Sequence, residues 1–147
     1  MTIGQERDVN IRKVISEDLN NTRRNLQQFI EFLPSDYQED TIDTVQRLLL
    51  DLRNLDKKIN LSPVGDTYKL KLDPTREALM NRELRTFDKE LSHKSSVLAK
   101  ATSTLNDMML DGKVKNITME LNKIRKYVSD LRNDVEHRDD IIKGVKF

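Results

Sequence analysis

Two pairs of an acidic residue and a histidine are the first candidates for chemistry in this chain. Glu90 precedes His93 by three residues, and Asp134 precedes His137 by three. Di-iron four-helix proteins bind metal through such carboxylate-x-x-His pairs on two helices, with a glutamate from each of the other two. Here the neighbouring residues Leu91 and Val135 occupy apolar seams, so both histidines should point toward solvent. We therefore expect no metal site.

Nucleophilic catalysis has equally little support. Ser92, Ser95 and Ser96 flank His93, but neighbouring positions on one helix do not build a nucleophile, a base and an orienting group that support one another. The chain has no cysteine and no glycine-rich phosphate loop. The expectation is that the protein is not an enzyme and uses no cofactor.

The composition favours long amphipathic helices. The 147 residues are 36% hydrophobic, 35% charged and only 5% aromatic, with four Gly and three Pro, which suits a helical bundle better than a sheet. The net charge of +1 gives no overall field that would attract nucleic acid or an anionic membrane. The polar N-terminus and the lack of a long uncharged apolar run predict a soluble, intracellular and cytoplasmic protein without a membrane span.

Proline, glycine and apolar periodicity divide the chain into four predicted helices. Their approximate ranges are residues 7–33, 36–60, 74–110 and 113–143, within a single helical domain of residues 1–147. Pro34, the Asp73-Pro74 start and the Asp111-Gly112 pair mark the breaks. Residues 61–73 are predicted to be a strap across one end of the bundle. The alternative is a short strand that pairs with another chain, because apolar and polar residues alternate at 68–72.

The third and fourth predicted helices are expected to form an antiparallel hairpin. The apolar frame slips by two residues at Asp111-Gly112, whereas discontinuities that keep a coiled-coil rod continuous insert three or four. One long bent helix is the alternative, since glycine inside a helix costs only about 1 kcal/mol. The seam predicted for the 74–110 helix consists of Met80, Leu84, Phe87, Leu91, Lys94, Leu98, Ala101, Leu105 and Met108.

Charge is distributed unevenly along the 113–143 helix. Residues 113–126 carry a balance of +4, and residues 129–140 carry a balance of −3. This order opposes the helix dipole, so a neighbour is expected to compensate it. Three neighbours are conceivable: the 74–110 helix, an antiparallel copy of the same helix, or a different protein with a complementary pattern.

Together these patterns predict an all-α fold: an elongated antiparallel four-helix bundle with coiled-coil-like packing. The third and fourth helices are expected to be longer than the first two, which would leave part of their hairpin uncovered. The predicted function is a non-catalytic protein–protein interaction module, a scaffold, adaptor or assembly subunit that binds another helical protein or a second copy of itself. The predicted partner-binding residues are Val128, Leu131, Val135, Arg138 and Ile142.

A nucleic-acid-associated helical protein is the alternative function. The basic half of the 113–143 helix could contact phosphates, together with Arg23-Arg24 and Lys57-Lys58. Acidic residues are interspersed, however, and no aromatic residues alternate with the basic ones to stack on bases. Nucleic acid is therefore not the expected partner.

Overall fold

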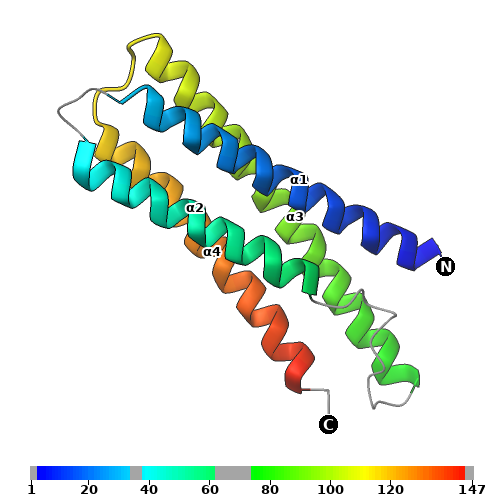
Figure 1. The fold of residues 1–147 in the computed structure, drawn as a ribbon. Helices are drawn as coiled ribbons and strands as arrows, with labels where there is room; N and C mark the ends of the chain where they lie inside the picture. The colour runs from blue at the N-terminus through cyan, green and yellow to red at the C-terminus, as the bar shows by residue number, and fades with distance from the viewer. Residues whose placement is uncertain (1–2, 34–37, 62–73, 145–147) are drawn as a thin grey trace.

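Four helices make up nearly all of the structure that a computed structural model describes, namely residues 3–33, 38–61 and 74–144. They are α1 (Ile3–Glu31), α2 (Gln38–Leu61), α3 (Pro74–Leu110) and α4 (Ile117–Gly144), and they pack against one another (Figure 1). The described residues contain no strand, which confirms the all-α prediction. Of the predicted strap at 61–73, only Leu61 lies within the described residues, as the end of α2.

The turn between α3 and α4 is the best-predicted boundary. α3 begins at Pro74 and ends at Leu110, as expected, and Gly112 follows with φ of +67°. The Gly112 amide donates to the Met109 carbonyl at 3.2 Å and the Lys113 amide to the Met108 carbonyl at 2.9 Å. These two bonds form a Schellman motif, which satisfies the last carbonyls of the helix. α3 and α4 are thus separate helices, and the alternative of one bent helix is wrong.

Two other predicted boundaries are wrong. α4 begins at Ile117 rather than at residue 113, because Asn116 caps it: the Asn116 Oδ1 accepts a hydrogen bond from the Met119 amide at 3.0 Å. α1 begins earlier than predicted, at Ile3. As a result α4, with 28 residues, is no longer than α1, with 29, and only α3, with 37, exceeds both.

The arrangement of the helices also differs from the prediction. α3 and α4 are antiparallel, and α1 and α2 run in opposite directions in Figure 1. α1 and α3 are parallel, because two hydrogen-bonded pairs, Asp18 with Ser95 and Asn25 with Thr102, share one sequence separation of 77 residues. α2 and α4 also run the same way (Figure 1). The structure therefore consists of two antiparallel pairs, α1 with α2 and α3 with α4. The two pairs pack together with α1 parallel to α3 and α2 parallel to α4, so not all neighbouring helices are antiparallel.

Each helix contacts two others. α1 and α4 each pack on both α2 and α3, and the α1–α3 contact is the most extensive. Among the described residues, α1 does not approach α4 and α2 does not approach α3. The connection from α2 to α3 therefore joins two helices that lie diagonally opposite each other.

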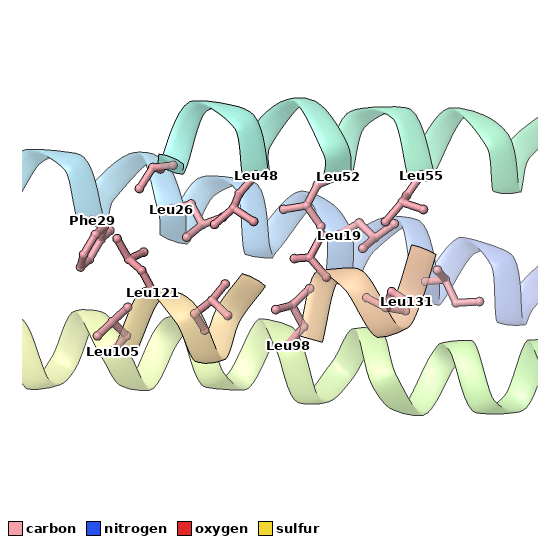
Figure 2. Packing of buried hydrophobic residues seen from close by; sticks show 14 of the residues in the cluster. Leu19, Leu26, Phe29, Leu48, Leu52, Leu55, Leu98, Leu105, Leu121 and Leu131 are labelled. Carbon is pink, nitrogen blue, oxygen red and sulfur yellow. The ribbon is translucent and has the colours of Figure 1, made fainter. Parts of the chain in front are cut away.

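The core is one cluster of hydrophobic side chains, nearly all of them aliphatic, that all four helices share (Figure 2). Leu52, Leu98 and Leu131 are almost completely buried at its centre, and fully burying a side chain of this size stabilises a fold by about 1.5–3 kcal/mol. The other labelled members in Figure 2 also point into the space between the helices: Leu19, Leu26, Phe29, Leu48, Leu55, Leu105 and Leu121.

A polar seam between α1 and α3 replaces half of the seam predicted for α3. Leu84, Leu91, Leu98 and Leu105 are buried as predicted. Between them, however, the buried positions are Asp88, Ser95 and Thr102, while Phe87, Lys94 and Ala101 are only partly buried.

Short polar side chains can be buried here because they find acceptors within their own helix. The Thr102 hydroxyl donates to the Leu98 carbonyl at 3.1 Å, and the Ser95 hydroxyl to the Ser92 carbonyl at 3.0 Å. Across the seam, the Asn25 Nδ2 donates to the Ala99 carbonyl at 3.2 Å, and the Asn106 Nδ2 to the Asn25 carbonyl at 2.8 Å. Small residues thus bring the backbones of α1 and α3 close together.

Candidate functional site

Four of the five partner-binding residues predicted from the sequence are buried within the bundle. Val128, Leu131, Val135 and Arg138 expose only 3%, 1%, 3% and 4% of their surface. The side chain of Ile142 lies outside what the structure describes. In this conformation the four described side chains are covered by the chain itself, so a binding surface has to be sought elsewhere.

The two histidines do not form a site together. Both are exposed, as their positions beside the seams predict, and His137 lies against Phe87 with ring centroids 5.3 Å apart. Within residues 3–33, 38–61 and 74–144, no three metal-ligating side chains gather in one place. None of the helices in these ranges is long and apolar enough to cross a membrane.

Two acidic residues in the C-terminal half of α4 are paired with other helices of the same chain. Asp134 pairs with Lys94 of α3, and the bond to Asp134 raises the pKa of Lys94. Asp139 lies 4.0 Å from the Lys58 ammonium of α2. The neighbour expected for this half is therefore present within the molecule.

A buried ion pair fixes the same end of α4 to α3. The Arg138 Nε donates to the Asp88 Oδ1 at 2.9 Å, and its Nη2 lies 3.5 Å from the Asp88 Oδ2. Each side chain exposes 5% of its surface. Arginine suits this position because its planar guanidinium can bind both carboxylate oxygens at once.

The basic half of α4 has no such compensation. The side chains of Arg125 and Lys126 in α4, and of Lys113 and Lys115 in the turn before it, are exposed, and none forms an ion pair in the part of the chain that the structure describes. Lys123 pairs only with Glu120 of its own helix, at 3.4 Å. The folded chain therefore pairs two acidic residues near the C-terminal end of α4 and leaves positive charge on the outside at the other end.

The first of two hollows beside this basic half is the apolar groove, which lies between α3 and α4. It has a volume of about 350 Å³. Ala101, with its single methyl group, leaves room between the two helices, and Tyr127 remains 41% exposed at the edge. Lys100 and Lys123 also line the groove. Its apolar residues are Val97, Ala101, Leu105, Met108, Ile124 and Tyr127.

The second hollow is the basic groove, which lies between α2 and α4 and has a volume of about 400 Å³. Arg125, Lys126 and Arg132 of α4 line it, with Asp51 of α2 as its one acidic residue. The polar lining contrasts with the apolar groove on the other side of α4, although both are bordered by the same basic half of that helix.

Comparison with known proteins gives no independent indication of function: no protein-family model, no curated protein and no solved structure matches this chain. The candidate surfaces rest on the geometry alone. The sequence contained one signal for them, the positive balance over residues 113–126, but it gave no sign that only this half of α4 would remain uncompensated.

Proposed function

We propose that this chain is a non-catalytic protein–protein interaction module, acting in the cytoplasm as a helical scaffold, adaptor or assembly subunit. Its binding surface is the apolar groove between α3 and α4. The partner is an amphipathic helix of another protein, with acidic residues beside its apolar face. One observation carries the proposal: an open apolar hollow is lined by Lys100, which forms no ion pair among the described residues, while Lys123 in the same lining pairs only with Glu120 of its own helix.

The shape of the groove favours a helix as its occupant. Its α3 wall consists of Val97, Ala101, Thr104 and Met108, at steps of four, three and four residues. From Val97 to Met108 the wall extends roughly 16 Å along the α3 axis, at a rise of 1.5 Å per residue. That length accommodates about three turns of a helix, which would contact the groove through apolar side chains at positions i, i+3 or i+4, and i+7.

The charge around the groove favours an acidic partner over a second copy of this chain. Lys100 and Lys123 line it, and Lys113 and Lys115 follow the turn from α3. An antiparallel dimer through α4 would bring its acidic half against the basic half of the other copy. Two acidic residues of that half, Asp134 and Asp139, are already paired with α3 and α2, so an external acidic helix matches the remaining charge better.

The proposal includes the finer architecture expected from the sequence, a four-helix bundle with coiled-coil-like packing. Leucines at seven-residue intervals along α3, from Leu84 to Leu105, support it. Such packing would hold α3 and α4 at a fixed spacing and keep the groove between them open for a partner.

Binding of two synthetic helical peptides tests the proposal. Both carry the same apolar face, one flanked by glutamates and the other by lysines, and binding is measured by fluorescence anisotropy. The acidic peptide should bind at least tenfold more tightly, because it meets Lys100 and Lys123. Ala101→Phe should fill the groove and abolish binding, whereas Ser103→Phe, an equally large change at an exposed α3 position outside the groove, should have no effect.

Three results would overturn the proposal. Equal affinity for the two peptides would rule out a preference for an acidic partner. Equal loss of peptide binding in the Ala101→Phe and Ser103→Phe variants would rule out the groove as the binding surface. A dimer in sedimentation experiments that Ala101→Phe converts to a monomer would show that the groove is occupied by a second copy instead.

A further inference from the structure

We propose that the basic groove between α2 and α4 binds the phosphate groups of a compact, polyphosphorylated small molecule. This site lies on the opposite side of α4 from the apolar groove. It therefore goes beyond the proposed interaction with a helical partner and does not depend on it.

The donors in the basic groove come from one face of α4. Arg125, Ser129 and Arg132 follow one another at steps of four and three residues, which places them in a row along the helix. Asn122 and Lys126 lie beside this row and line the same hollow. Two guanidinium groups, one ammonium, one amide and one hydroxyl thus converge on a single space, and all five can donate hydrogen bonds to an oxyanion.

The cations in this space have no partner in the described part of the chain. Arg125, Lys126 and Arg132 form no ion pair or hydrogen bond there through their side chains. Three cations at other helix contacts are paired, by contrast: Arg138 with Asp88, Lys94 with Asp134 and Lys58 with Asp139. Three positive charges line the groove against one negative charge, that of Asp51. An anion with two charges would balance this excess.

The base of the groove strengthens this attraction. Leu48 of α2 and Val128 of α4 line it and are buried, with 4% and 3% exposure. An apolar base keeps water from one side of the charges, so a bound anion interacts with the guanidinium groups in a medium of lower dielectric than bulk water. Arginine also binds phosphate through two parallel hydrogen bonds, which favours phosphate over a monovalent anion.

The size and lining of the groove favour a small ligand over nucleic acid. Its volume of about 400 Å³ lies within the range of about 300–1,000 Å³ that is typical of small-molecule sites. No aromatic side chain is among the described residues that line it, so nothing there could stack on a base. Asp51, at the α2 side, would repel a continuous phosphate backbone more than a compact ligand that contacts only α4.

Isothermal titration with inorganic tripolyphosphate tests the site on the full chain. Arg125→Gln and Arg132→Gln should each weaken binding by roughly tenfold, the effect expected when a charge-assisted hydrogen bond pair is lost. Asp51→Asn should strengthen binding, because it removes the one negative charge. Lys113→Gln and Lys115→Gln remove the same charge from exposed positions outside the groove and should leave the affinity within about twofold at moderate salt.

Three results would overturn the proposed anion site. Equal weakening by the groove and the control variants would show a diffuse charge effect and overturn the site. An unchanged or lower affinity of Asp51→Asn would place the anion elsewhere. If a short duplex DNA bound and tripolyphosphate failed to displace it, the positive surface would belong to nucleic acid and the small-molecule proposal would be wrong. Circular dichroism of each variant confirms that the helices are retained.

Discussion

The buried pair of Asp88 and Arg138 should contribute far more to stability than the other ion pair between α3 and α4. Both side chains expose only 5% of their surface, and the Nε–Oδ1 distance is 2.9 Å. Asp88→Ala would leave the guanidinium buried without its carboxylate, and breaking a buried pair from one side costs about 3–5 kcal/mol. That is a large fraction of the roughly 5–15 kcal/mol by which a domain is stable.

A matched control exists between the same two helices. Lys94 and Asp134 expose 39% and 22% of their side chains, so water already solvates part of their charge. Asp134→Asn should therefore cost less than about 1 kcal/mol, as for other surface pairs. Each of the two substitutions breaks an ion pair between α3 and α4, and the two pairs differ mainly in how deeply they are buried.

Urea unfolding followed by circular dichroism at ~222 nm measures both effects. With an m value of about 2 kcal/mol per molar urea, Asp88→Ala should lower the midpoint by about 2 M, and Asp134→Asn by less than about 0.5 M. The double variant Asp88→Leu/Arg138→Met should recover most of the loss, since apolar residues of similar size can replace a buried ion pair. A loss below about 1 kcal/mol for Asp88→Ala, or a double variant as unstable as the sum of the single ones, would refute the reasoning.

Three further predictions concern local structure. Gly112→Ala should destabilise the protein by about 1–2 kcal/mol in a thermal melt, because the φ of +67° strains any side chain while the space around it is open; Gly112→Asn should cost less, and equal losses would point to a steric cause. Asn116→Ala should cost about 1 kcal/mol through loss of the α4 cap, which a melt unchanged by the substitution would contradict. Burial raises the pKa of Asp18 above its usual 3.8, and the hydrogen bond from Ser95 opposes this only in part. The folded state thus holds that proton more tightly than the unfolded state, and the contribution of Asp18 is lost as the pH rises through the raised value. The stability of Asp18→Asn relative to the unmodified protein should therefore rise from about pH 3 to about pH 7, and a constant difference would contradict it.

The sequence predicted the ends of a helix well where a proline or a glycine marks them. Pro74 and Gly112 define α3 because one fits only the start of a helix and the other readily adopts the left-handed conformation at its end. The start of α4 was missed because Lys113 continues an apparently helical pattern, while the capping side chain of Asn116 stands three residues further on.

Counting apolar residues could not reveal how α3 packs on α1. Ser95 and Thr102 resemble surface residues in any hydrophobicity scale, yet they are buried because their hydroxyls bond to carbonyls of their own helix. The heptad pattern predicts Lys94 and Ala101 at the seam in their place.

The partner surface predicted on α4 falls largely on buried residues for a related reason. An apolar stripe has the same appearance in a sequence whether it is covered by its own chain or by another protein, so Val128 and Leu131 could be assigned to either. The two grooves depend on which side chains remain unpaired after folding, and only three-dimensional contacts decide that.

The parallel packing of α1 on α3 has a consequence for how the chain folds. The most extensive contact of α1 is made with residues about 77 positions further along the chain, not with the helix that follows it. Contacts between such distant residues slow folding, because a long loop must close before they form. During synthesis, α1 would lack its most extensive contact until α3 has left the ribosome. We therefore expect the protein to fold more slowly than helical proteins of its size that pack only sequential neighbours.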